Sequence, residues 1–319
     1  MKCTFRLVFA SLVIAAATPF LPSVAVLAQS ASSTPHADEI RALQASIATA
    51  PAQADAATWL RLAVYCQDAA RYTESEQAYR KAISLLKSSD QAGLAIALDH
   101  MGTMYAETGR LDKAEPLEQR ALEIRQSLND STAIGTTYMH LAVLYLAKHD
   151  PATAETDAEM AVSLIAPTQP HPLTSASPTP EQQMAALINL SLVRCARRSC
   201  ATAIPQLTRA LALAQANYQP SSVPVGFIHF LLGYANWKSG NPTAAAQLMK
   251  AGTSELESQL GWGHPTYIAA LKQYQGFLTQ SGDTAEALEV GARLAAFNRS
   301  HQGQPSSPAR ASLSLDQLP

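Results

Sequence analysis

The sequence predicts an all-α solenoid of about six helix-turn-helix repeats, and three observations support this fold class. Apolar residues at helical spacing recur about every 40 residues, turn residues divide each copy in two, and one anchor position keeps the register. The anchors are Ala63, Gly102, Ala142, Ser191, Gly233 and Gln275, with steps of 39, 40, 49, 42 and 42 residues. A period of this size is typical of stacked units rather than of one closed globule.

Residues 37–49 precede the first copy and predict a single leading helix. Because the open end of a solenoid needs a cover, we expect this helix to cap the first repeat, and we assign residues 29–54 to an N-terminal cap. The repeat domain then covers residues 55–297.

The first three copies each predict a helical hairpin. Apolar positions of the first copy lie on both sides of a break near residues 69–71, which indicates two helices and a short turn. The second copy has Gly109 in its turn, where a glycine suits the left-handed end of a helix because it has no side chain to clash. In the third copy Pro151 follows the turn, and proline is favoured just inside a helix start because its missing N–H has no partner there.

The last three copies also predict helical hairpins, and the pattern is weakest in the fourth copy. The turn of the fourth copy, residues 197–200, contains no glycine, so its hairpin geometry is the least well determined. The fifth copy has Gly240 in its turn, and the sixth has Gly282. Between the third and fourth copies, residues 166–180 contain five prolines and predict a surface loop, which accounts for the 49-residue step.

The two ends of the chain predict segments outside the repeats. Residues 1–28 are typical of a secretory signal peptide, with Lys2 and Arg6 before an apolar run and small residues before a cleavage site at Gln29. An uncleaved membrane anchor is the alternative. We therefore expect an exported protein, in a bacterial periplasm, whose membrane contact is confined to this segment. Residues 298–319 predict a disordered tail.

The repeats resemble the tetratricopeptide repeat, whose pattern is a bulky residue, Leu-Gly and Tyr, followed after the turn by Ala, an aromatic residue and Ala. The matching residues are Trp59, Leu62, Ala63, Tyr79 and Ala82 in the first copy, Met101, Gly102, Tyr105, Ala114 and Ala121 in the second, and Leu232, Gly233, Gly240 and Ala245 in the fifth. The period near 40 is similar to the long repeats of kinesin light chains. The resemblance implies a right-handed superhelix that binds partners along its concave face and performs no catalysis.

In that family the first helix of each pair faces the concave groove, which places an apolar, partly aromatic strip there. The candidate groove residues are Arg61, His100, Met139, His140, Val143, Leu146, Asn189, Leu192, Phe230, Tyr234, Trp237 and Lys272. An exposed strip of this kind favours an extended or helical apolar segment of a protein or peptide partner. The alternatives are that the tail, the Pro-rich loop or a second subunit fills the strip, or that the projection is out of register.

Charge and ligand spacing argue against nucleic acid and metal. Without the signal segment the chain has 25 acidic residues and 21 basic ones (23 less Lys2 and Arg6), whereas nucleic acid requires a basic stripe. His100 and His140 occupy equivalent positions in adjacent copies, with Asp99 and Asn189 nearby. Neighbouring helices stand ~10 Å apart, too far for two ligands at ~2 Å from one ion. We therefore predict no metal and no other cofactor.

Cys195 and Cys200 flank the turn of the fourth copy, and an exported protein permits a disulfide between them. Two separate thiols packed near the turn are the alternative. A disulfide here would take the place of the missing turn glycine in fixing the hairpin.

The sequence contains no motif of an enzyme, such as a Gly-x-Ser-x-Gly elbow, a phosphate-binding glycine loop or His-Glu-x-x-His. We therefore expect a scaffold that binds a protein or peptide. One alternative is a structural subunit of an envelope complex that assembles with copies of itself. The other is a cell-wall module whose groove aromatics stack on sugars.

Overall fold

The computed structural model describes residues 36–86, 89–168 and 177–300. Within these residues every regular element is a helix: α2 (Ala37–Thr49), a short 3-10 helix η2 (Pro51–Gln53), and six helix pairs. The pairs are α3 (Ala56–Asp68) with α4 (Tyr72–Leu85), α5 (Gln91–Glu107) with α6 (Leu111–Ser127), α7 (Ser131–Ala147) with α8 (Pro151–Ile165), α9 (Pro180–Ala196) with α10 (Cys200–Asn217), α11 (Val223–Lys238) with α12 (Pro242–Leu260), and α13 (Pro265–Ser281) with α14 (Thr284–Ser300). The predicted all-α solenoid of six hairpins is confirmed.

Four predicted segments fall wholly or partly outside the described residues, and one of them is the N-terminal cap, of which residues 29–35 are outside. The signal peptide, residues 1–28, is outside them, and so are residues 169–176 of the Pro-rich loop. Of the predicted tail, 298–319, the structure describes 298–300, which end α14, so the last helix continues past the predicted domain end at 297. None of the described helices is both long enough and apolar enough to cross a bilayer.

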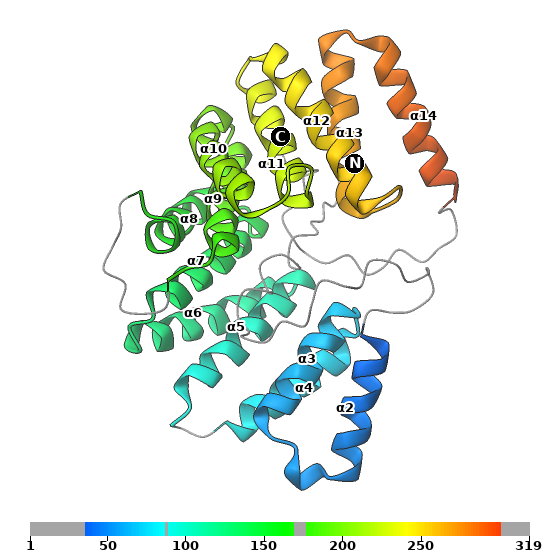
Figure 1. The fold of residues 1–319 in the computed structure, drawn as a ribbon. Helices are drawn as coiled ribbons and strands as arrows, with labels where there is room; N and C mark the ends of the chain where they lie inside the picture. The colour runs from blue at the N-terminus through cyan, green and yellow to red at the C-terminus, as the bar shows by residue number, and fades with distance from the viewer. Residues whose placement is uncertain (1–35, 87–88, 169–176, 301–319) are drawn as a thin grey trace.

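The helix pairs follow one another along a curve from α2 and α3 at one end to α14 at the other (Figure 1). The two helices of each hairpin pack on each other, each second helix but the last also packs on the first helix of the next copy, and α2 packs on α3. The first helices of neighbouring copies also contact each other, as α3 does with α5, α5 with α7 and α7 with α9. We call the partly exposed surface of the first helices α3, α5, α7, α9, α11 and α13 the inner wall.

One residue in each hairpin turn has left-handed backbone geometry, and it lies at the same phase in all six copies. These residues are Ala70, Gly109, His149, Arg198, Gly240 and Gly282, with φ between 57° and 86°. Each follows its anchor by seven positions, as Gly109 follows Gly102 and Arg198 follows Ser191. The turn geometry is therefore set by the period, and three copies adopt it without a glycine.

The anchors are small because the second helix of each hairpin crosses there. A Cβ atom added at Gly102 would stand 2.7 Å from Glu118 Oε1, and one at Gly233 would stand 2.6 Å from the backbone nitrogen of Met249. The sixth copy reverses the arrangement: Gln275 is the anchor, and Gly291 on α14 leaves room for its side-chain amide. This reversal explains how the copy with a large anchor still forms the same hairpin.

The fourth hairpin, which the sequence determines least, has the same geometry as the others. Arg198 takes the left-handed turn position with φ 60°. Cys195 at the end of α9 and Cys200 at the start of α10 form a disulfide across this turn. Of the two alternatives that the sequence leaves open for these cysteines, the structure has the disulfide.

The buried side chains form a core that continues along the solenoid rather than one central cluster. One large cluster joins the first three copies and includes Leu62, Tyr79 and Met104. Another joins the last three copies and includes Phe230 and Tyr267. Each copy is thus stabilised by its neighbours, as expected of a repeat array.

Candidate functional site

Four of the apolar groove residues lie in the core instead of on an open surface. Met139 is 1% exposed and Leu192 is 5% exposed. Phe230 and Tyr234 are 0% exposed. Their side chains pack where consecutive copies meet, among other buried residues of the neighbouring helices. The prediction that these four residues form an open strip is therefore wrong, because adjacent repeats cover them.

Three apolar groove residues keep part of their surface exposed on the inner wall. Val143, Leu146 and Trp237 are half-buried and pack against the core from outside. The Trp237 ring meets Phe277 edge to face, with ring centroids 5.8 Å apart, and the Lys238 ammonium lies 4.3 Å above the same ring. The inner wall thus has small apolar areas in its third and fifth copies rather than a continuous strip.

The polar groove residues divide into exposed and half-buried ones. Arg61 on α3 and Lys272 on α13 are exposed, in the first and last copies. His100, His140 and Asn189 are half-buried, and the Asn189 side-chain amide donates to the Met139 carbonyl at 3.1 Å. The twelve predicted residues therefore do not form one site.

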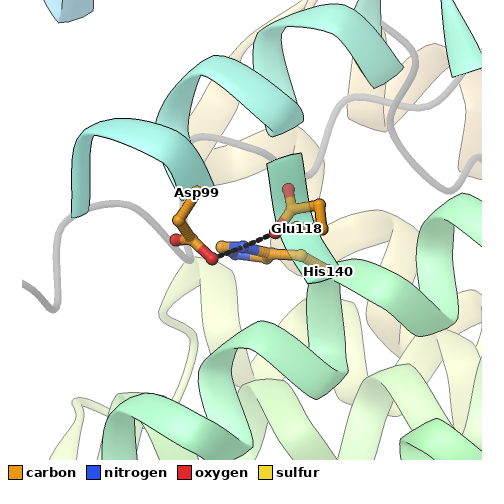
Figure 2. A group of neighbouring side chains, drawn as sticks. All are labelled: Asp99, Glu118 and His140. Atoms are coloured by element: carbon orange, nitrogen blue, oxygen red, sulfur yellow. Dashed lines mark hydrogen bonds and ion pairs between the residues drawn. The ribbon is translucent and has the colours of Figure 1, made fainter. Parts of the chain in front are cut away.

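A group of charged side chains fills the joint between the second and third copies, and we call Asp99, Glu118, Arg125 and His140 the charged cluster. Figure 2 shows Asp99 from α5, Glu118 from α6 and His140 from α7 converging. His140 Nδ1 lies 3.1 Å from Asp99 Oδ1 and 3.9 Å from Glu118 Oε2. The Arg125 guanidinium donates to the same oxygen, Asp99 Oδ1, at 2.9 Å.

Burial makes the protonation of this cluster unusual. Burial and the negative charge of Asp99 raise the pKa of the Glu118 carboxyl well above its usual value. Burial alone would also raise the pKa of Asp99, but the adjacent His140 and Arg125 lower it below the usual value. Burial lowers the pKa of the neighbouring His100 to about 4. The pKa values of the two carboxyls are therefore shifted in opposite directions, and Asp99 is the more acidic of the two.

Comparisons with known proteins agree with the fold of repeated helix pairs. The model of the tetratricopeptide repeat family matches residues 55–127 and 93–166. Residues 55–166 contain tetratricopeptide repeats. No curated protein matches the sequence. A solved structure of kinesin light chain repeats from Podosopora anserina is 18% identical, with a TM-score of 0.52, covering 65% of this chain and 95% of that one.

Two further solved structures have a similar fold. BtubC (BKLC) from P. vanneervenii is 18% identical, with a TM-score of 0.57, covering 76% of this chain and 94% of that one. A Rap protein, solved in complex with Competence and Sporulation Factor, is 13% identical, with a TM-score of 0.57, covering 86% of this chain and 82% of that one. At these identities the likeness establishes the fold alone.

Asp99 and His140 were recognised from the sequence as candidate polar residues of the tetratricopeptide hairpins, whereas Glu118 was not recognised as a site residue. The buried face of α6 consists of Ala114, Glu118, Ala121, Ile124 and Arg125, so a carboxylate and a guanidinium stand where small and apolar residues are expected. Those two charges on an apolar face were the signal. Although neighbouring first helices stand ~10 Å apart, their side chains span this distance, since His140 Nδ1 on α7 lies 3.1 Å from Asp99 Oδ1 on α5. Glu118 reaches the same joint from a second helix.

The charged cluster can hold a proton or a cation, because it presents carboxylate oxygens and an imidazole nitrogen within 4.8 Å of one another. Glu118 Oε1 is 3.3 Å from the Thr103 hydroxyl, which donates to it, whereas the buried Oε2 has no hydrogen-bond partner. Gly102 makes this placement of Glu118 possible, since any larger residue there would collide with the carboxylate. The charged cluster is therefore a site of fixed geometry inside the tetratricopeptide array.

Proposed function

We propose that this protein is an exported tetratricopeptide-repeat scaffold that binds a protein or peptide partner on its inner wall and catalyses no reaction. The observation that carries the proposal is the composition of the first helices. Their half-buried side chains combine apolar surface, at Val143, Leu146 and Trp237, with hydrogen-bonding groups at His100 and Asn189. Surfaces of this mixed kind are typical of peptide recognition, in which apolar anchors supply energy and polar groups fix the register.

The second helices have a different surface. On α6, for example, Gln119, Arg120, Glu123 and Gln126 are exposed, as expected for a solvated outer face. The Rap structure holds a partner, Competence and Sporulation Factor, on the same fold, which supports a binding role here.

Site-specific photo-crosslinking in the full-length exported chain tests the proposal. A crosslinking amino acid placed at Leu146 or Trp237 samples the inner wall. Matched controls at Met160 on α8 and Ser258 on α12 sample exposed positions on the second helices of the same copies. We expect crosslinked partners from Leu146 and Trp237 only. Equal capture from the control positions, or capture from them alone, would overturn the inner wall as the binding surface.

The same experiment tests self-assembly. If the protein assembles with copies of itself, the crosslinked product will contain two copies of this chain instead of a different partner. Light scattering of the purified protein then gives the stoichiometry. The remaining alternative, stacking on sugars, now rests on Trp237, since Phe230 and Tyr234 are 0% exposed. Titration with wall fragments while tryptophan fluorescence is recorded tests it, and an unchanged spectrum removes it.

Cell fractionation tests the export on which the proposal depends. We expect the chain in the periplasmic fraction, shortened at Gln29. Recovery of an unshortened chain in the membrane fraction would indicate that residues 1–28 remain as an anchor.

A further inference from the structure

We propose that Asp99, Glu118 and His140 bind a divalent transition-metal ion of the Zn²⁺ class at the joint between the second and third repeats. The three side chains come from three different helices, α5, α6 and α7, and converge on one point (Figure 2). An ion there would connect both helices of one hairpin to the first helix of the next.

The distances between the ligand atoms fit one ion. Zn²⁺ binds imidazole nitrogen and carboxylate oxygen at ~2.0–2.2 Å in a tetrahedron, so its ligand atoms stand about 3.3–3.5 Å apart. His140 Nδ1 lies 3.1 Å from Asp99 Oδ1 and 3.9 Å from Glu118 Oε2, and all three atoms lie within 4.8 Å of one another. Side-chain movements of less than an ångström or so would bring all three to bonding distance, since these are flexible torsions rather than backbone.

Glu118 supplies an independent reason to expect a ligand. Glu118 is 1% exposed. Its Oε2 atom faces His140 and accepts no hydrogen bond. A buried carboxyl oxygen without a partner is destabilising, because it has lost its hydrogen bonds to water and gained none in the protein. A cation bonded to Oε2 would remove this penalty, and the Thr103 hydroxyl at Oε1 already holds the carboxylate in the required orientation.

The donor set selects the class of metal. One imidazole nitrogen and two carboxylate oxygens suit Zn²⁺ and its neighbours, whereas Mg²⁺ prefers six oxygens in an octahedron and keeps several waters. Three protein ligands also leave the fourth tetrahedral position for a water molecule.

Arg125 and Thr137 complete the environment of the ligands. The Arg125 guanidinium donates to Asp99 Oδ1, the same oxygen that His140 approaches, and to the Thr137 hydroxyl. These contacts hold the Asp99 carboxylate in place. Hydrogen bonds of this kind commonly orient ligating carboxylates. The positive charge of Arg125 also opposes the cation, so we expect metal affinity below that of a structural zinc site.

Metal titration of the full-length exported protein, after removal of metal with EDTA, tests the proposal. We expect one Zn²⁺ per chain by mass spectrometry of bound metal, a rise in the unfolding temperature with Zn²⁺, and no comparable rise with Mg²⁺. Glu118→Gln and His140→Gln should each lower the Zn²⁺ affinity at least about 100-fold, because each removes one of three ligands.

The chain offers a matched control in the fifth copy. His229 Nδ1 lies 2.8 Å from Glu255 Oε2, a contact of the same kind for which no third ligand atom is gathered among the described residues. Glu255→Gln should therefore retain one Zn²⁺ per chain with unchanged affinity.

Three results would overturn the proposal: no Zn²⁺ bound by the wild-type protein, full binding by Glu118→Gln, or equal loss in Glu255→Gln. If Glu118→Gln does not fold, as judged by circular dichroism, the wild-type protein with Co²⁺ decides. A tetrahedral nitrogen and oxygen site gives strong visible absorption that Zn²⁺ abolishes by competition, and its absence would mean that the cluster is balanced by protons alone.

Discussion

Two joints of this solenoid have the same hairpin geometry and opposite chemistry. Between the second and third copies, buried Asp99, Glu118 and Arg125 meet His140. Between the fifth and sixth copies, Tyr234, Trp237 and Phe277 form an aromatic cluster, with edge-to-face ring contacts at 5.7 and 5.8 Å. The anchors and turns therefore determine the hairpin, whereas the side chains packed between copies can be either ionic or apolar.

The two joints also differ in how they depend on solution conditions. Apolar burial responds little to pH, whereas a buried ionic joint depends on the protonation of its members. Substitutions in the two joints, in α8 and in the turns should therefore differ in size and in pH dependence.

Removing an aromatic ring from the apolar joint should have the largest effect. Phe277 is 2% exposed and contacts the rings of Trp237 and Tyr274. We expect Phe277→Ala to lower the free energy of unfolding by about 4 kcal/mol, because it removes buried area and leaves a cavity. Urea unfolding at pH 5 and pH 8 measures it, and the loss should be equal at both. A loss that changes with pH would contradict the apolar description of this joint.

Breaking the ionic joint should cost slightly less. Arg125→Met leaves the buried Asp99 carboxylate without its guanidinium partner, and we expect a loss of about 3 kcal/mol. Adding Asp99→Asn to Arg125→Met should restore part of this loss, because the uncompensated charge is then removed. The same urea measurement on the single and double variants gives the coupling. Strictly additive losses would show that Asp99 and Arg125 do not act as a pair.

A single carboxyl on α8 should make the third copy sensitive to pH. Burial, followed by the charge of Asp150, raises the pKa of Asp157 to about 6. The pKa of Asp157 in the folded protein thus lies above the unfolded value of 3.8. The proton bound to Asp157 therefore stabilises the folded state fully below about pH 4, and this stabilisation is lost as the pH rises through about 6. Asp157→Asn should therefore stabilise the protein by roughly 2 kcal/mol at pH 7.5 and have little effect at pH 4. A gain independent of pH would contradict this origin.

The smallest effect on stability concerns the hairpin turns, which have the same backbone geometry in all six copies. Ala70 has φ 57°, a left-handed geometry that costs a residue with a Cβ atom energy. We expect Ala70→Gly to raise the free energy of unfolding by about 0.5–1 kcal/mol, because relief of strain exceeds the added freedom of the unfolded chain. Ala69, with φ −79°, is the matched control, and Ala69→Gly should be destabilising. Two changes of the same sign would show that the turn position carries no strain.

The fold was predictable because its determinants are local and repeated. The anchors, the turn glycines Gly109 and Gly240 and the proline at Pro151 recur at one phase, and the structure has a hairpin at each. The fourth copy needed no glycine, since Arg198 adopts the same turn conformation and the disulfide spans it.

The inner wall was harder to predict because each residue rotates the side-chain direction by about 100° around a helix. An error of one position therefore exchanges a residue that faces the open side for one that faces the next repeat. Tyr234 and Phe230 are examples, since both are buried against neighbouring copies. Glu118 escaped prediction for a related reason, because its role depends on three helices that the sequence places far apart.

The six left-handed turn residues have a practical consequence, because the turns that contain them recur with the repeat and join the helices outside the inner wall. At Gly109, Gly240 and Gly282 an added Cβ atom would meet no other atom within 4 Å. Segments grafted at these loop tips would extend into solvent without disturbing the helices. The protein is thus suited to carry fluorophores or affinity tags at regular intervals along its length, and pairs of such labels would report directly the distance between chosen repeats.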